Sequence, residues 1–279
     1  MRLDTTLPLV LSALSTSGCG PVREPVPASE QPASISASAV PSRFDGFEGD
    51  SIAAFWLPGD YGSGRYAPGA VSISTEFART GNRSAAITVR EGDVEQRGDS
   101  GQRNERAELD SGKHPFGDRD FWYGFSFRIP PEFPVVDTRL VVAQWKQTKV
   151  SGGPLVAQRY RAGIHYLTIR DWSRAAGVRR TYRLPAIVHG AWNDMVYRIR
   201  PSVGDDGIVE VWMNGDPVVS HEGPTASTGG EPRIYNKIGL YRDRMAEPMT
   251  IHFDNYAMGD GFAAVDPSRF DRGDASVRR

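Results

Sequence analysis

Short segments in which hydrophobic and polar residues alternate dominate the chain from about residue 42 onward. They are rich in β-branched and aromatic residues and are separated by Gly, Pro, Asp and Asn, which is typical of β-strands joined by turns. The pattern predicts strands over residues 84–90, 104–109, 121–130, 140–147, 163–170, 194–201, 207–215, 236–243 and 249–259. No segment keeps a helical hydrophobic period through three turns. We therefore expect an all-β fold, a β-sandwich or β-jelly roll, in one domain.

The pattern changes outside residues 42–265, which we expect to be the folded domain. Residues 1–19 contain a short apolar run and the only cysteine, Cys19. The run is too short to span a bilayer but suits an export signal, and "TSGC" resembles a bacterial lipoprotein processing box. Residues 20–41, rich in Pro, Ser and Ala, predict a disordered linker, and residues 266–279 predict a flexible tail.

These N-terminal features predict an exported bacterial protein that is periplasmic, secreted or held at the outer membrane through a lipidated Cys19. Processing at or near Cys19 leaves a mature chain without a free cysteine, which excludes disulfides, thiol catalysis and cysteine-bound metals. We expect the protein to be a monomer.

Positive and negative charges are balanced, with 33 Lys and Arg against 34 Asp and Glu. The balance gives no electrostatic reason to expect binding to nucleic acid. Lysine occurs only at Lys113, Lys146, Lys149 and Lys237, so arginine carries most of the positive charge. The planar guanidinium donates two parallel hydrogen bonds, which suits recognition of carboxylates and sulfates.

Four predicted strands have one apolar face and one polar face, because successive side chains on a strand point to opposite sides. The polar faces carry Asn104, Arg106 and Glu108; Val142, Gln144 and Lys146; Tyr166, Thr168 and Arg170; and Lys237, Gly239 and Tyr241. One such face is typical of any exposed sheet, but four with this inventory favour a shared concave groove. Gly239 leaves space there for a ligand. Arginines for carboxylates, with amides and tyrosines for hydroxyls and ring faces, suit an anionic polysaccharide.

Several motifs also resemble a known family. "DSGQRNERAEL", "FWYGFSFRIPPEFP", "LVVAQWKQ", "NKIGLYRD" and "MTIHFDNYAMG" occur in the order seen in heparin lyase I-like and glucuronan lyase-like polysaccharide lyases. "RAEL", "AQWK" and "KIGLYR" further resemble the R-x-E-L, Q-I-H and K-A-G-x-Y motifs of jelly-roll alginate lyases. The resemblance covers about residues 44–260. It implies a concanavalin-like β-jelly roll that needs no cofactor and cleaves a uronic-acid polymer by β-elimination. The cationic residues are moderate in number rather than dense, which favours an unsulfated, glucuronan-type polymer.

The resemblance also implies roles for individual residues. By position, Arg106 and Glu108 fall on the first motif, Gln144 and Lys146 on the second, and Lys237 and Tyr241 on the third. Arg106 and Gln144 would hold the substrate carboxylate, as preorganised donors must when charge develops on it. Tyr241 is the implied general acid and a candidate base. Lys146 replaces a histidine of the alginate lyase motif, so it is either the base or another carboxylate partner.

Further residues are candidates for substrate contact. Glu108 is expected to orient Arg106. Asn104, Tyr166 and Arg170 lie on the polar faces, Arg242 follows Tyr241 directly, and His114 is in a turn after the first motif strand. His165 lies on an apolar face with Leu167 and Ile169, which favours a core histidine.

A structural calcium ion is a further expectation. Asp254 in the last predicted strand, with Glu48 or Asp45 near the start of the domain, offers the oxygen ligands that Ca²⁺ prefers. The sequence contains no dedicated calcium-loop motif.

Two other classes of protein remain as alternatives. A glycoside hydrolase of the laminarinase type needs an E-x-D-x-x-E strand, which is absent, and Glu105 and Glu108 lie on opposite faces of their strand. A non-catalytic carbohydrate-binding module would keep the cationic face but would not need the hydroxyl of Tyr241 for turnover.

Overall fold

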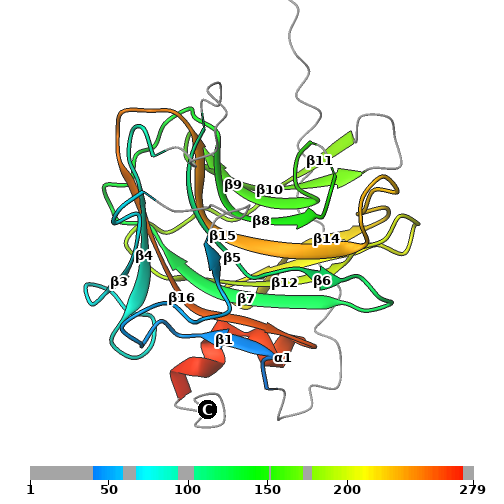
Figure 1. Cartoon of the computed structure of the whole chain (residues 1–279), viewed down its shortest axis with the longest axis horizontal. Helices are drawn as coiled ribbons and strands as arrows, with labels where there is room; N and C mark the ends of the chain where they lie inside the picture. The colour runs from blue at the N-terminus through cyan, green and yellow to red at the C-terminus, as the bar shows by residue number, and fades with distance from the viewer. Residues whose placement is uncertain (1–39, 59–66, 94–103, 151, 172–177, 273–279) are drawn as a thin grey trace, which may run out of the picture.

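The computed structural model describes residues 40–58, 67–93, 104–150, 152–171 and 178–272. Two antiparallel β-sheets pack face to face (Figure 1), and the hydrophobic core lies between them. This arrangement confirms the predicted all-β jelly roll.

The first sheet, called here the back sheet, contains eight strands. Its order is β14 (Asp216–Glu222), β13 (Ile208–Met213), β12 (Asn193–Arg200), β7 (Phe121–Arg128), β16 (Met249–Gly259), β4 (Ser84–Val89) and β3 (Val71–Ser74), with β1 (Arg43–Asp45) also paired to β16.

The second sheet contains the three motif strands and is called here the motif sheet. Its order is β11 (Val178–Arg183), β10 (Ile164–Asp171), β9 (Val156–Arg161), β8 (Leu140–Gln147), β15 (Arg233–Asp243), β5 (Asn104–Asp110) and β2 (Leu57–Pro58), with β6 (His114–Pro115) also paired to β15. Strand β15 lies between β8 and β5, so the three motifs are neighbours in space although they are far apart in the sequence.

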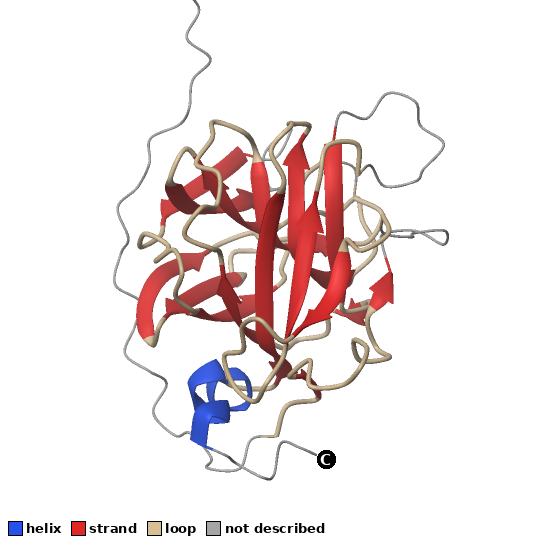
Figure 2. Cartoon of the chain, turned by 90° about the vertical axis from the view of Figure 1, so that its left-hand side faces the viewer, coloured by secondary structure: helices blue, strands red, loops and turns tan. Residues whose placement is uncertain are grey.

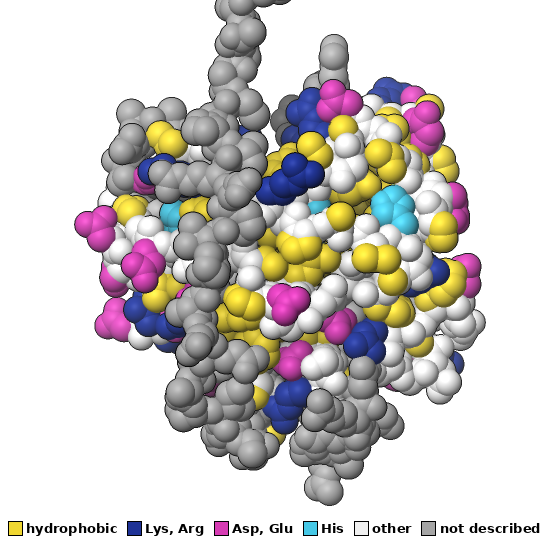
Figure 3. All heavy atoms as spheres, turned by 180° about the vertical axis from the view of Figure 1, so that it is seen from behind, with side chains coloured by type: hydrophobic (Ala, Val, Ile, Leu, Met, Phe, Trp, Pro, Cys, Tyr) yellow, Lys and Arg dark blue, Asp and Glu magenta, His cyan; other side chains and the backbone are white. Residues whose placement is uncertain are grey.

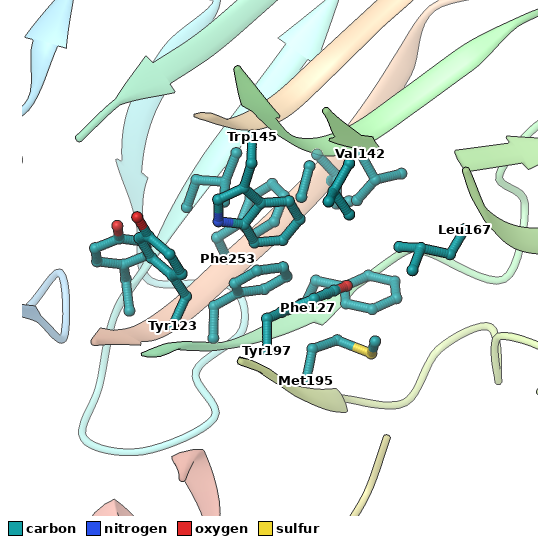
Figure 4. Packing of buried hydrophobic residues seen from close by; sticks show 14 of the residues in the cluster. Tyr123, Phe127, Val142, Trp145, Leu167, Met195, Tyr197 and Phe253 are labelled. Atoms are coloured by element: carbon teal, nitrogen blue, oxygen red, sulfur yellow. The ribbon is translucent and has the colours of Figure 1, made fainter. Parts of the chain in front are cut away.

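Aromatic side chains from both sheets fill the core. The rings of Trp145 on β8 and Tyr197 on β12 lie 4.3 Å apart, and Tyr123 on β7 packs edge-on against Trp145. Figure 4 shows these rings with Phe127 and Phe253 between the two sheets. These contacts hold the strands of the motif sheet rigidly from their inner side.

One side chain of β8 faces the core instead of the predicted groove. The register between β8 and β9 shifts between Val141 and Ala143, so the two-residue alternation breaks there. Val142 is 2% exposed and packs in the core (Figure 4). Val141 takes its place on the outer face, opposite Tyr241.

The folded part extends beyond the boundary expected at residue 265. Helix α1 (Phe262–Val265) and the 3₁₀ helix η1 (Pro267–Arg272) follow β16 directly. The ring of Phe270 packs 4.7 Å from that of Phe44. Figure 2 shows the helical segment at one end of the sandwich.

The predicted export segment, the lipidation site at Cys19 and residues 20–39 of the predicted linker lie outside the described residues. Within the described part of the chain, no helix has the length and apolar character needed to cross a membrane. Seen from behind (Figure 3), Lys and Arg side chains are intermingled with Asp and Glu side chains, as the balanced composition leads one to expect.

Candidate functional site

Strand register aligns six side chains in one row across the outer face of the motif sheet. The row, called here the tyrosine row, runs through Arg106, Tyr241, Val141, Arg159, Tyr166 and Arg183. Directly opposed residues of neighbouring strands point to the same side of a sheet, and neighbouring strands are about 4.8 Å apart. The sheet therefore presents these side chains side by side.

The ring of Tyr241 lies between two guanidinium groups. The guanidinium carbon of Arg106 is 4.0 Å from the ring centroid, and that of Arg139 is 4.4 Å from it. Both distances are within the range of cation–π attraction. Nη2 of Arg139 also donates hydrogen bonds of 2.6 Å to Oδ1 of Asn104 and to Oδ1 of Asp243. The phenol is thus fixed in position and surrounded by positive charge.

Arg139 is firmly bound in this position although it precedes β8 in a loop. Burial opposes its charge, but hydrogen bonds with Asp243 and Tyr241 outweigh burial and raise its pKa. The sequence pattern does not indicate Arg139, because it lies just outside the predicted strand, where no alternation shows the direction of its side chain.

Glu108 connects the first motif with the second. Nε2 of Gln144 donates a 2.5 Å hydrogen bond to Oε1 of Glu108, and Nη1 of Arg106 lies 3.8 Å from Oε2. The carboxylate is 3% exposed, so it contacts these neighbours rather than solvent. Glu108 is therefore placed to orient both Arg106 and Gln144, the two donors expected to hold a substrate carboxylate.

Lys237 and Lys146 occupy different positions from Tyr241 along the sheet. Lys237 is opposite Gln144 and is 1% exposed, so it lies in the floor of the outer face. Lys146 is opposite Tyr235 and is partly exposed. It is five residues beyond Val141 on β8, which at roughly 3.3 Å per residue separates their backbones by roughly 16 Å. Register therefore does not bring Lys146 beside Tyr241.

Arg242 does not face the substrate side, contrary to the expectation from sequence. Its side chain and that of Glu105 are fully buried between the sheets and form a 2.8 Å ion pair. Arg242 also donates hydrogen bonds to the carbonyl oxygens of Met245 and Glu247. Its side chain points inward because that of its neighbour Tyr241 points outward. Arg242 therefore has a structural role, in which it neutralises Glu105 and binds two backbone carbonyl oxygens.

His114 is also placed away from the outer face. It pairs with Ile234, a core residue, and its ring centroid is 6.5 Å from that of Phe121. Burial, followed by the charge of Arg43, lowers the pKa of His114. The structure thus places His114 on the inner side of the sheet.

Gly239 has a different role from the one that sequence suggests. Its φ is +146°, and a Cβ at this position would lie 2.3 Å from the carbonyl oxygen of Ala107 and 2.8 Å from Cα of Glu108. Glycine is needed for close packing of β15 against β5, not for space above the sheet.

Arg159 is a second residue of the outer face that the sequence motifs do not include. It lies in the tyrosine row beside Tyr166, is 7% exposed, and donates a 2.9 Å hydrogen bond from Nε to Oγ1 of Thr168. The alternation in "VAQRYR" is the signal for it, because it places Arg159 opposite in direction to Val156 and Tyr160. Arg170, on the same face of β10, is opposite Arg179 on β11.

His165 is the core histidine that its apolar neighbours predict. Nδ1 donates to the carbonyl oxygen of Pro185 at 2.9 Å, and Nε2 accepts from Nε2 of Gln158 at 2.9 Å. Oε1 of Gln158 in turn accepts from the hydroxyl of Tyr197. Burial lowers the pKa of His165 to about 4, so the ring is neutral and fully bonded.

The calcium site remains a prediction. Within the described chain, no group of three or more His, Cys, Asp or Glu side chains is arranged to bind a metal. Asp45 accepts hydrogen bonds from Phe47, Ala53 and Trp56. Burial raises the pKa of Asp254 to about 7, and the nearby charge of Glu48 adds to this effect. Both carboxylates already accept hydrogen bonds from backbone N–H groups. These donors do not fit a calcium ion without rearrangement.

Comparison with known proteins gave a family match and several structural matches. The family model described as polysaccharide lyase matches residues 42–257, which is more than half of the chain. No curated protein matches. The crystal structure of an endo-β-1,4-glucuronan lyase from the fungus Trichoderma reesei is similar, with a TM-score of 0.63 and 20% identity over 82% of this chain and 99% of that chain.

Two other solved structures have lower scores. The cellulose induced protein Cip1 has a TM-score of 0.51 and 14% identity, covering 78% of this chain and 97% of its own. Alginate lyase A1-II', of polysaccharide lyase family 7, has a TM-score of 0.51 and 17% identity, covering 70% and 85%. At these identities the structural matches establish the jelly-roll fold alone.

Proposed function

We propose, because this chain belongs to the polysaccharide lyase family, that it cleaves a uronic-acid polymer of the glucuronan type by β-elimination. The observation that carries the proposal is the ring of Tyr241 held between Arg106 and Arg139, with Gln144 joined to the same group through Glu108. The similarity to a glucuronan lyase supports the choice of polymer.

In this reaction a base removes the proton on C5 of a uronate, next to its carboxylate. The electron pair forms a C4–C5 double bond, and the C4–O bond breaks as the leaving oxygen takes a proton from an acid. Negative charge builds up on the carboxylate, where preorganised donors stabilise it best. Arg106 and Gln144, both fixed by Glu108, supply these donors.

Tyr241 is assigned both proton transfers. In glucuronate the C5 hydrogen and the C4 oxygen are on the same face of the ring, so one group can take the first proton and deliver one to the leaving oxygen. The two guanidinium groups that contact its ring hold the phenol in place for both transfers. Lys146, which register places away from Tyr241, is assigned to substrate carboxylate binding.

The experiment is ultraviolet absorbance of the unsaturated product, with the purified full chain incubated with glucuronan, alginate or heparin, each with and without calcium. We expect absorbance to rise with glucuronan. Iduronate, the C5 epimer of glucuronate, and guluronate, the C5 epimer of mannuronate, place the two groups on opposite ring faces. Guluronate-rich alginate and heparin should therefore react far more slowly. No absorbance change with any polymer, together with retained binding in gel retardation, would contradict the lyase and favour a binding module.

Localisation is proposed from sequence. The apolar N-terminal run and Cys19 support export and membrane tethering through a lipid. If the protein is a lipoprotein, Cys19→Ser should release it from the membrane. Cell fractionation measures the release.

A further inference from the structure

One arginine of the outer face has a buried charge and no acidic partner. Arg159 is 7% exposed and its hydrogen bond to Thr168 involves a neutral hydroxyl. Within the described residues it forms no ion pair with Asp or Glu. Burial lowers the pKa of Arg159 to about 10, and Arg179 and Arg139 act in the same direction, yet the group remains charged at neutral pH.

The surroundings of Arg159 add positive charge rather than compensating it. Arg179 and Arg183 on β11 lie on the same face, opposite Arg170 and Tyr166. Burial and the charge of Arg179 also lower the pKa of Arg170. The described outer-face positions of β9, β10 and β11 carry no Asp or Glu; they are Ala157, Arg159, Arg161, Ile164, Tyr166, Thr168, Arg170, Arg179, Thr181 and Arg183.

The other half of the sheet is different. There Arg106 contacts Glu108, and Arg139 is bonded to Asp243. Burying a charge without a partner costs free energy, so the buried and uncompensated Arg159 destabilises the free protein. An anionic ligand removes this cost, and a carboxylate is the group whose geometry a guanidinium matches with two hydrogen bonds.

We propose that Arg159, flanked by the exposed arginines of β11, forms a second carboxylate-binding subsite, which holds a uronate other than the one that reacts at Tyr241. The inference rests on the proposed function and specifies its substrate. Arg159 is two strands from Tyr241 in the tyrosine row, about 10 Å away, too far to hold the carboxylate that Arg106 and Gln144 bind. The preferred substrate is therefore a polymer that carries carboxylates on successive residues, not one with isolated uronates.

The test compares Arg159→Gln with Arg161→Gln on glucuronate oligomers, measuring KM and kcat by product absorbance. Arg161 is on the same strand and face but is exposed and already paired with Asp137, so it is the matched control. We expect Arg159→Gln to raise KM about 10-fold or more while kcat changes less than about 3-fold, because the lost contact is made equally in ground and transition states. Arg161→Gln should leave both constants unchanged.

Melting temperature separates this role from a structural one. If Arg159 serves ligand binding, Arg159→Gln should melt at the same temperature as the wild type or higher, since it removes an uncompensated charge. A lower melting temperature with an unchanged KM would overturn the proposal. If the wild type cleaves no uronate polymer, the proposed function is wrong, but the subsite can still be tested. Calorimetry then measures the affinity of glucuronate oligomers for the wild type and for Arg159→Gln. Equal affinities would refute the subsite.

Discussion

The guanidinium carbon of Arg106 lies 4.0 Å from the centre of the Tyr241 ring, and the two residues are directly opposed on β5 and β15. This pairing joins the first and third sequence motifs in one contact. Arg139 approaches the same ring from the start of β8, so the phenol is held by residues from three neighbouring segments of the motif sheet. Its position therefore depends on the pairing of β5 with β15 and on the segment that leads into β8.

The first prediction concerns the hydroxyl of Tyr241. Tyr241→Phe keeps the ring and its contacts with the two arginines but removes the proton donor. We expect kcat to fall at least about 100-fold, the usual contribution of a general acid or base, with oligosaccharide affinity nearly unchanged. Steady-state kinetics and calorimetry measure the two quantities. Tyr166→Phe is the control, since it removes a hydroxyl from the same row and should affect turnover far less.

The second prediction concerns the buried pair of Glu105 and Arg242. Removing either partner leaves an uncompensated charge between the sheets, so Arg242→Met or Glu105→Gln should lower the free energy of unfolding by about 3–5 kcal/mol. The double variant should recover much of this loss. Urea denaturation measures it. Activity per folded molecule should persist in Arg242→Met, and a selective loss of substrate affinity would instead restore Arg242 as a substrate contact.

The sequence predicts most strands because each sheet has the core on one side only. Hydrophobic and polar residues therefore alternate along its strands. Strands β8 and β16 have the bounds that the pattern predicts. The same alternation already places Glu105 and Arg242 on inward faces, but charge alone suggests exposure, and only the structure shows that the two neutralise each other. The family resemblance is confirmed by the family match, which covers nearly the same residues.

What the sequence misses depends on features without a local signal. The bulge at Val141 and Ala143 adds one residue and exchanges the faces of Val141 and Val142, which no two-residue period can reveal. Arg139 reaches Tyr241 from a loop, so its role depends on tertiary packing. For Gly239 the sequence suggests a feature that the structure does not have. A glycine on a polar face indicates space for a ligand, but the space beside Gly239 is filled by the backbone of β5.

The third prediction is a pH dependence from His165. Its pKa is about 4 in the folded protein and about 6.5 when unfolded. The unfolded state therefore binds the proton first, and stability falls as the pH drops from 6.5 toward 4, by about 1.4 kcal/mol per pH unit. His165→Asn should show a shallower acid loss than the wild type, about 2 kcal/mol less between pH 6.5 and 5.

This measurement compares slopes because another group acts in the opposite direction. Asp254 has a pKa of about 7 in the folded state, so between pH 7 and about 4 the native protein binds its proton and gains stability. Asp254 contributes equally to the wild type and to His165→Asn. The difference between their free energies of unfolding at each pH therefore reports on His165 alone. Parallel pH profiles for the wild type and His165→Asn would contradict the assignment of His165 as a neutral core residue.

The fourth prediction tests calcium at Asp254 and Glu48. If the two carboxylates bind the ion after their backbone hydrogen bonds rearrange, calcium should raise the melting temperature and a chelator should lower it. Glu48→Gln should remove the calcium dependence, whereas Asp50→Asn is the control, because Asp50 is an exposed carboxylate of the same loop that pairs with Arg83. An identical melting temperature with calcium and with chelator would show that the prediction is wrong.

The fifth prediction distinguishes two roles for Gly239. A Cβ at Gly239 would lie 2.3 Å from the carbonyl oxygen of Ala107, on the strand that carries Arg106. Gly239→Ala should therefore push β5 away from β15 and lower the free energy of unfolding by at least about 2 kcal/mol, since strained backbone alone costs about 1–3 kcal/mol. Activity should fall with it, because the same ladder positions Arg106 against Tyr241. Gly69→Ala is the control for positive φ, as Gly69 has a φ of +72° and nothing within 4 Å of its Cβ position. If Gly239→Ala keeps full stability and loses only substrate affinity, then the glycine makes room for the ligand and the packing explanation is wrong.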